Sequence, residues 1–510
     1  MKIKLHFCWL LTSTLFLFSC NQKTKKPHVQ LQLSVKDSLA NEIEIGTNKY
    51  LNYLILSKVK PDSTGSAIVQ LKIDKPTFAY LSMGRHSAEL YLAPDYDLHV
   101  EIETGPYGSL RLRFEGRGAA INNYLAQASL LSNFSINSGG RNITGLEQAA
   151  FFARFDSLKN KLNTFHQHYI DSLSLITSLN LEKKSTKEPS LSENENQVLQ
   201  ERIEIKLLSF RQEYVFMKYN NALVDQRYAL KEGKEIVPFK LSTELQNIVD
   251  EMPLDTVGIN LGLAEYRDLS QMYLSNKIFL PSYDVRTWDK VKYHYPLKAI
   301  QTLKEGNYPE AIREYLIAQA LQYYLVMQGI TPATDSIFND FKKNYSTSLY
   351  KAGLKKDYDE WSAILPGQLA PDFNGFDSEG KKIYLHDLRG KVVYVDVWAT
   401  WCGPCLDEIP HSKKIISRFE NNENVAFLNV SVDRDHKVWL KMITEKKDWK
   451  GIHINLAGGQ IDSLFSSYKM GGVPTYILID QKGKLVKAQA SSPSEGKISE
   501  ELFALLNQFH

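Results

Sequence analysis

Cysteine is scarce in this sequence. Its 510 residues contain four, at positions 8, 20, 402 and 405, and the first two lie in an N-terminal segment treated below. This count excludes a fold built on a framework of disulfides. Cys402 and Cys405 have no other thiol of a folded domain with which to exchange partners, which suits a disulfide that is repeatedly made and broken.

An excess of charge of one sign is also absent. Lys and Arg together number 61, Asp and Glu number 58, and the formal net charge is +3. A net charge so close to zero argues against a dedicated surface for nucleic acid. Hydrophobic residues make up 43% of the sequence, which is enough for ordinary cores. The length predicts roughly three globular domains.

Long hydrophobic runs are missing except near residue 1. Lys2 and Lys4 precede an apolar stretch from Leu5 to Phe18, which is short for a membrane span. The residues Leu-Phe-Ser-Cys that end at Cys20 resemble a bacterial lipobox. We predict a lipoprotein signal peptide over residues 1–19, a lipidated Cys20 that anchors the chain, and a polar tether over residues 20–27. An uncleaved signal anchor, or an ordinary signal peptide with an incidental cysteine, is the alternative.

Short β-rich runs separated by turn residues fill positions 28–116. They predict a β-rich domain, an antiparallel β-sandwich or a barrel. The runs are Val29–Val35, Tyr50–Lys60, Ala67–Ile73, Phe78–Met83, Ala88–Ala93, Leu98–Glu103 and Leu110–Phe114.

A helical period replaces the strand pattern over residues 117–363, for which we predict a helical middle region. The polar, charged stretch Leu181–Asn196 contains Pro189 and predicts an exposed loop or mobile insertion. The clearest helical runs are Ile121–Leu131, Leu146–Leu173, Gln197–Tyr219, Ala264–Phe279 and Tyr308–Met327.

Strands and helices alternate over residues 364–510 and predict an α/β domain whose sheet is covered by helices on both faces. A β-branched and aromatic run, Val392–Val397, ends at a short turn that leads into Trp-Cys-Gly-Pro-Cys at 401–405. The predicted strands are Lys381–Leu385, Val392–Val397, Val425–Val432, Gly451–Leu456, Tyr476–Asp480 and Leu485–Ala490. The predicted helices are Cys402–Phe419, His436–Lys446, Ile461–Tyr468 and Ile498–Gln508.

The position of Cys402 at a helix start determines its chemistry. A helix N-terminus has unpaired N–H groups and the positive end of the helix dipole, so it stabilises a thiolate. In such a setting the thiol pKa falls from about 8.5 to between about 3.5 and 7.5, which makes Cys402 a nucleophile at neutral pH. Cys405 lies one turn further on the same face, where it can close a disulfide with Cys402 and act as the buried, resolving cysteine.

The pair has two other interpretations. A zinc site needs four ligands, and no second Cys pair or His-x-x-x-His completes this one, so no metal is predicted. A purely structural disulfide would join distant segments, whereas a loop of two residues removes little entropy from the unfolded chain.

The residues around the pair resemble the thioredoxin superfamily, and in particular its exported TlpA/ResA-type branch. The matching residues are Pro366–Phe373, Leu388–Lys391, Trp401–Cys405, Glu408–Pro410 and Gly472–Thr475. The resemblance covers residues 365–510, under a third of the chain. It implies a thioredoxin-like fold for 364–510 and an exported thiol-disulfide oxidoreductase that needs no cofactor. A β-rich module precedes the redox domain in some lipoproteins of this kind.

The resemblance also assigns roles to single residues. Asp396 matches a buried acid that takes the proton from Cys405, with a water-facing strand-end Asp as the alternative. Pro474 matches a cis-proline, and Val473 before it faces the sulfurs and pairs with an extended substrate; an ordinary trans turn is the alternative. Trp401 is predicted to contact substrate. Glu408 matches an acidic position of the branch, but an exposed charge near the helix start explains it as well.

The resemblance further implies partners and a location. We expect disulfide-containing exported proteins as substrates, such as those of cytochrome c maturation, and a membrane thiol-disulfide transporter as electron donor. The chain would be lipid-anchored in the bacterial cell envelope and face the periplasm. Two functional alternatives remain: a thiol peroxidase, and a client-binding envelope lipoprotein whose redox domain is accessory.

Overall fold

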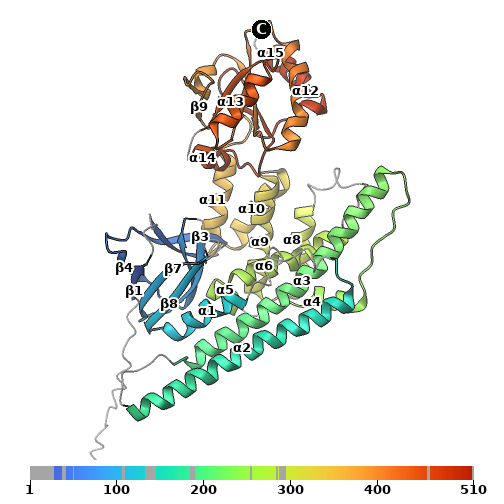
Figure 1. Cartoon of the computed structure of the whole chain (residues 1–510). Coiled ribbons are helices and arrows are strands. Elements are labelled where there is room, and N and C mark those ends of the chain that lie inside the picture. The colour runs from blue at the N-terminus through green and yellow to red at the C-terminus, as the bar shows by residue number, and fades with distance from the viewer. Residues whose placement is uncertain are drawn as a thin grey trace, which may run out of the picture. The chain divides into compact units, whose positions relative to one another are not determined.

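The computed structural model (Figure 1) describes most of the chain after residue 27. The described residues are 28–36, 42–49, 51–84, 86–105, 109–131, 145–183, 190–252, 256–282, 285–286, 295–456 and 460–507. The predicted signal peptide, the lipidation site Cys20 and the tether lie outside them. The described chain forms two compact units. One contains the residues up to 48 together with Tyr53–Ile203 and Gly258–Leu263, and the other contains Lys49–Asn52, Glu204–Val257 and Ala264 onward.

The first unit contains a β-sandwich. Alternate residues of its strands are buried, as in β1, where Val29, Leu31 and Leu33 face inward. The two sheets have the strand orders β4-β1-β7-β8 and β3-β2-β5-β6, and inward residues of both sheets share one core. The strands are β1 (His28–Val35), β2 (Ile43–Lys49), β3 (Asn52–Val59), β4 (Ser66–Lys72), β5 (Thr77–Met83), β6 (His86–Leu92), β7 (Asp97–Thr104) and β8 (Leu110–Arg117).

The β-rich domain is confirmed, and two of its features differ from the sequence prediction. The strand β2 was missed because Gly46 lies in its middle, where glycine usually marks a turn. In the structure this glycine permits a close approach, since a Cβ there would lie 2.3 Å from the Tyr53 ring. In addition, β1 pairs with β7 in parallel, whereas the prediction was antiparallel throughout. Hairpin spacing shows which neighbouring strands pair and says nothing about strands far apart in sequence.

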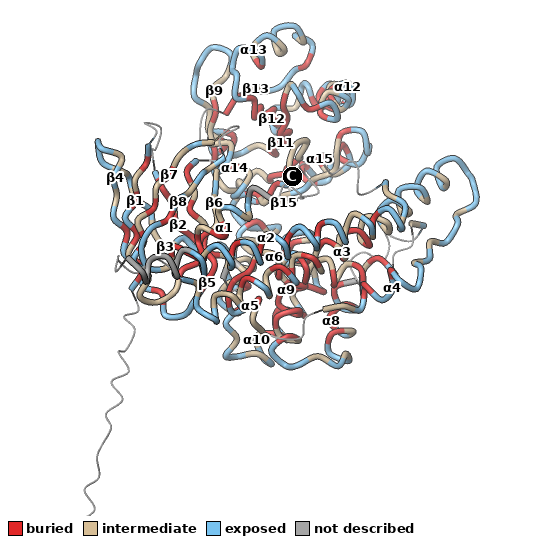
Figure 2. Tube along the Cα trace, turned by 60° about the horizontal axis from the view of Figure 1, so that its bottom comes forward, coloured by how far each residue is buried: buried red, intermediate tan, exposed pale blue. Residues whose placement is uncertain are grey.

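The middle region is helical, as predicted. Its helices are α1 (Ala119–Leu131), α2 (Gln148–Lys183), α3 (Glu193–Lys231), α4 (Thr243–Asp250), α5 (Val257–Leu261), α6 (Ala264–Leu274), α8 (Tyr295–Glu305), α9 (Glu310–Gln328), α10 (Pro332–Asn344) and α11 (Lys351–Ser362). Long exposed stretches run along α2 and α3 (Figure 2). None of the helices in the described part of the chain is long and apolar enough to cross a membrane.

Both ends of the predicted loop Leu181–Asn196 are helical. Its first residues belong to α2, which ends at Lys183, and its last residues belong to α3, which begins at Glu193. The cause is a capping box that the sequence interpretation overlooked. The Glu195 carboxylate accepts the backbone N–H of Ser192 at 2.7 Å, and the Ser192 hydroxyl accepts the N–H of Glu195 at 3.3 Å.

The second unit ends in an α/β domain with a seven-stranded sheet. The strand order is β10-β9-β13-β12-β11-β14-β15, with β11 parallel to β12 and antiparallel to β14. All residues of β11 and β12 are buried, which places them in the interior of the sheet (Figure 2). The strands are β9 (Asn374–Phe376), β10 (Lys382–Tyr384), β11 (Val392–Trp398), β12 (Val425–Ser431), β13 (Ile452–Asn455), β14 (Thr475–Ile479) and β15 (Leu485–Lys487). The helices are α12 (Gly403–Arg418), α13 (His436–Glu445), α14 (Gln460–Ser467) and α15 (Ile498–Asn507).

These elements confirm the predicted thioredoxin-like domain. The predicted strands and helices are all present, and most of their ends agree within two residues. Among the strands that the structure describes in this domain, β9 was not predicted, because its residues Asn-Gly-Phe contain turn-forming Asn and Gly and show no strand pattern.

Candidate active site

The turn after β11 delivers the cysteine pair to the start of α12. Cys402 is the N-cap residue, and its sulfur accepts the backbone N–H of Cys405 at 3.2 Å. Pro404 is tolerated in the first turn, where a backbone N–H has no partner inside the helix. The sulfur of Cys402 therefore lies where unpaired N–H groups and the helix dipole favour negative charge.

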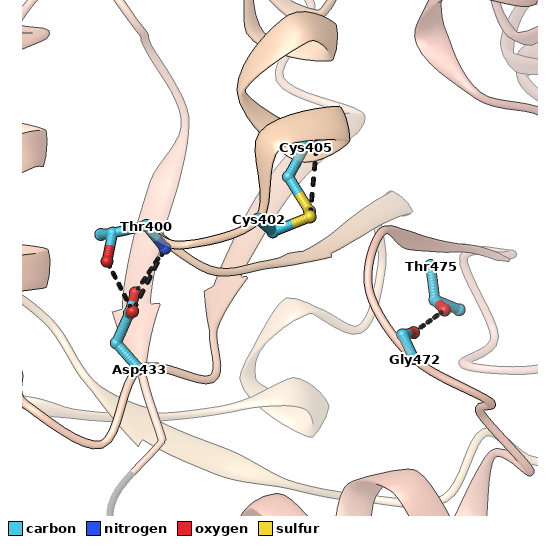
Figure 3. Close-up of a disulfide and its surroundings, with 6 residues drawn as sticks. All are labelled: Thr400, Cys402, Cys405, Asp433, Gly472 and Thr475. Carbon is cyan, nitrogen blue, oxygen red and sulfur yellow. Dashed lines mark hydrogen bonds between the residues drawn. A yellow bond between two sulfur atoms is a disulfide. The ribbon is translucent and has the colours of Figure 1, made fainter. Parts of the chain in front are cut away.

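Cys402 and Cys405 are joined by a disulfide, with their Cα atoms 5.3 Å apart (Figure 3). The sequence interpretation made Cys405 the buried member of the pair. In this closed form both cysteines are buried, at 5% and 4% exposure. Trp401, which precedes Cys402 in the sequence, is 70% exposed.

Asp396 lies inside the domain, on the buried strand β11. Only 5% of the residue is exposed, so the alternative of a strand-end acid facing water is wrong. Burial raises the pKa of its carboxyl to about 7, the negative charge of Glu408 adds to the rise, and the hydroxyl of Ser412 opposes it. A carboxyl with this pKa can accept or return a proton near neutral pH.

The chain segment before β14 reaches the same end of the sheet as the turn before α12. Thr475 pairs with Val397 at the end of β11, so Val473 and Pro474 come next to the turn that leads to the cysteines. The peptide bond between Val473 and Pro474 is cis, as the resemblance implied. The Thr475 hydroxyl donates to the carbonyl of Gly472 at 2.7 Å and ties this loop together (Figure 3).

Glu408 is more than an exposed charge near the helix start. Its carboxylate accepts the backbone N–H of Ser494 at 2.8 Å and also the Ser494 hydroxyl. This contact ties α12 to the 3-10 turn Pro493–Glu495. Ser494 lies 86 residues away in sequence, and no local pattern marks it.

The sequence interpretation also missed Asp433, a buried carboxylate that binds the turn before Cys402. One signal could have found it. Asp433 follows the buried strand β12, and the C-terminal ends of the parallel strands β11 and β12 lie at one edge of the sheet. Among the residues that the structure describes, no group of three or more His, Cys, Asp or Glu is placed to hold a metal ion.

Comparison with known proteins gives similar sequences and folds. The Redoxin family profile matches residues 365–504. The thiol-disulfide oxidoreductase ResA of Bacillus cereus (strain ZK / E33L) is 33% identical over 121 residues, which are 24% of this chain and 67% of that protein. The same-named protein of Geobacillus thermodenitrificans (strain NG80-2) is 30% identical over 145 residues, which are 28% of this chain and 80% of that protein.

Solved structures are similar as well. The thioredoxin domain of a thiol-disulfide oxidoreductase from Bacteroides vulgatus is 29% identical and covers 29% of this chain and 98% of its own, with a TM-score of 0.25. A thiol:disulfide interchange protein from Bacteroides sp. is also 29% identical and covers 27% of this chain and 90% of its own, with a TM-score of 0.25.

Proposed function

Since the chain belongs to the family of ResA-type thiol-disulfide oxidoreductases, we propose that it reduces disulfides of exported proteins while anchored to a membrane through Cys20. The observation that carries the exchange chemistry is the Cys402–Cys405 disulfide at the N-terminus of α12. Export, anchoring and a role in cytochrome c maturation rest on the lipobox-like residues before Cys20 and on the resemblance.

The reaction begins with the open, dithiol form. The Cys402 thiolate attacks one sulfur of the substrate disulfide, the substrate S–S bond breaks, and its other sulfur leaves as a thiolate and takes up a proton. A mixed disulfide between Cys402 and the substrate remains. The Cys405 thiol then loses its proton to the Asp396 carboxylate and attacks the Cys402 sulfur. The substrate leaves with two electrons, and the closed pair seen in the structure forms.

Each turnover leaves the protein oxidised, so a dithiol donor must reopen the pair. We propose a membrane thiol-disulfide transporter for this step, as the resemblance implies. The Gly-Pro dipeptide between the cysteines is that of reducing thioredoxins, whose potential is about −270 mV, and it supports the reducing direction.

One contact favours disulfide exchange over the thiol peroxidase alternative. Peroxidases of this superfamily use a Thr-x-x-Cys setting, whereas Thr400 precedes Cys402 by two positions. The Thr400 hydroxyl donates its hydrogen bond to Asp433 at 2.7 Å, and it therefore does not donate to the Cys402 sulfur.

Substrate trapping tests the proposed exchange. In Cys405→Ser the resolving step is lost, so mixed disulfides should accumulate on Cys402 in cell-envelope extracts. Cys402→Ser lacks the attacking sulfur and should trap nothing, which makes it the matched control. Equal trapping by both variants, or by neither, would contradict the proposal.

The anchor is tested separately. Cys20→Ala should move the chain from the membrane fraction to the soluble fraction and abolish its labelling by radioactive fatty acid. Unchanged fractionation and labelling would contradict lipidation at Cys20 without affecting the exchange chemistry.

A further inference from the structure

A second buried carboxylate, Asp433, holds the turn between β11 and α12. Its oxygens accept the backbone N–H of Thr400 at 3.0 and 3.2 Å, and one of them accepts the Thr400 hydroxyl at 2.7 Å. Figure 3 shows both donors of Thr400 directed at this carboxylate. Asp433 is 3% exposed while Thr400 is partly buried, so the acceptor side of these bonds is buried, and bonds to a charged acceptor are the stronger kind.

Asp433 is itself held by residues at the ends of two strands, Ser431 of β12 and Asn455 of β13. The Ser431 hydroxyl donates to it at 2.8 Å and accepts the backbone N–H of Asp433 at 3.1 Å. The side-chain amide of Asn455, at the end of β13, donates to the backbone carbonyl of Asp433 at 2.9 Å and to the Ser431 hydroxyl at 3.0 Å. Asp433 therefore cannot shift without disturbing a buried network.

The turn that Asp433 holds contains only three residues before Cys402. At its start the Trp398 carbonyl accepts the N–H of Val432 at 2.9 Å, and at its end the N–H of Cys402 donates to the Ala399 carbonyl at 3.1 Å. Thr400, in the middle, is fixed by Asp433. Trp401 follows with an exposed side chain, and the bonds from Thr400 to Asp433 lie two residues before the attacking Cys402.

We propose that Asp433 is a positioning residue for disulfide exchange: by clamping Thr400 it keeps the Cys402 sulfur over the N-terminus of α12. This inference rests on the proposed function and names a further residue that serves the same site. Asp433 contacts neither cysteine in the structure's hydrogen-bond network and acts through the turn. The negative charge of Asp433 would by itself disfavour a nearby thiolate. Loss of positioning therefore predicts a higher pKa of the Cys402 thiol when the carboxylate is removed, whereas loss of the charge predicts a lower one.

The test compares Asp433→Ala with Asp433→Asn in the full chain. Alanine removes both acceptor oxygens, while asparagine keeps one oxygen of the same shape and removes the charge. The readouts are the rate of reaction with bis(2-hydroxyethyl) disulfide, the titration of the Cys402 thiolate by its ultraviolet absorbance in a Cys405→Ser background, and the unfolding midpoint.

We expect Asp433→Ala to slow the reaction about tenfold and to move the Cys402 titration to higher pH. Asp433→Asn should stay within about threefold of wild type, because the Thr400 bonds can still form. If both variants instead titrate at lower pH and react faster, the charge dominates and the proposal is overturned. It is also overturned if only the unfolding midpoint changes.

Thr400 supplies an independent pair of variants should Asp433→Ala fail to fold. Thr400→Val loses the hydroxyl donor at nearly constant shape and should react more slowly, whereas Thr400→Ser keeps the donor and should match wild type. Equal reaction rates of Thr400→Val and Thr400→Ser would overturn the proposal that the bond between Thr400 and Asp433 positions Cys402. A wild type that exchanges no disulfide would contradict the proposed function, while the Cys402 titration would still decide the role of Asp433.

Discussion

Asp396 and Tyr476 lie opposite each other on the neighbouring antiparallel strands β11 and β14. Within the described part of the chain, neither Asp396 Oδ1 nor the Tyr476 hydroxyl has a hydrogen-bond partner, although both atoms are buried. The Tyr476 ring stacks on Tyr394 with centroids 5.7 Å apart. The charged form of Asp396 is thus poorly compensated, which favours a protonated carboxyl on the strand that leads to the cysteine pair.

The first prediction concerns stability. The pKa of Asp396 is about 7 in the folded chain and near the ordinary value of 3.8 in the unfolded chain. The folded state therefore binds more protons between these values, and stability falls as pH rises from about 4 to about 7. Asp396→Asn should be more stable than wild type by up to about 4 kcal/mol above pH 7, and the gain should fade toward pH 4.

Urea unfolding of the oxidised chain at a series of pH values measures this difference. The exposed Glu445→Gln is the control, since its effect should be small at every pH. A stability difference between Asp396→Asn and wild type that is the same at pH 4 and pH 8 would contradict the assignment.

The second prediction concerns the release step. Without a carboxylate to take the proton from Cys405, Asp396→Asn should resolve the mixed disulfide about a hundredfold more slowly at neutral pH, while the first attack by Cys402 is nearly unchanged. Acid-quenched single-turnover reactions followed by mass spectrometry would show the mixed disulfide accumulating. A slower first step with no accumulation would argue against the proton-accepting role.

The third prediction concerns Glu408. Its negative charge raises the pKa of Asp396, so Glu408→Gln should lower that pKa and move the pH dependence of release to lower pH. The matched control is Ser494→Ala, which removes a hydroxyl bound to Glu408 but leaves the charge in place. Equal shifts in both variants would show that the contact with the 3-10 turn, rather than the charge, affects Asp396.

The fourth prediction concerns Trp401. Since its side chain is 70% exposed, Trp401→Ala should change the free energy of unfolding by less than about 1 kcal/mol. We expect it to slow the reduction of a protein disulfide such as insulin by about tenfold and that of a small disulfide much less. Val438→Ala, another exposed apolar position of the domain, is the control. Equal loss on both substrates would contradict a substrate contact.

The parts of this fold that follow local patterns could be predicted from the sequence. The run of buried residues in β11, the turn and the N-cap Cys402 are neighbours along the chain, so their period and spacing carry the information. The helix α12 and the hairpin of β14 and β15 are detectable in the same way.

The remaining features join residues that are distant in sequence. They depend on which parts of the chain become neighbours in the fold. Examples are the parallel pairing of β1 with β7, the contact of Glu408 with Ser494 and the bonds between Asp433 and Thr400. No local pattern in a single sequence shows which parts of the chain become neighbours. The start of α3 at Glu193 is different, because the capping signature of Ser192 and Glu195 was present in the sequence and the polar, charged composition around it pointed to a loop.

The exposed indole at position 401 also gives this protein an optical readout. A disulfide quenches the emission of a tryptophan next to it, and the other tryptophans of the described domain core, Trp398, Trp439 and Trp449, are buried away from solvent. Opening of the Cys402–Cys405 bond should therefore brighten the fluorescence of the unlabelled chain, so that electron transfer to and from it can be followed in real time.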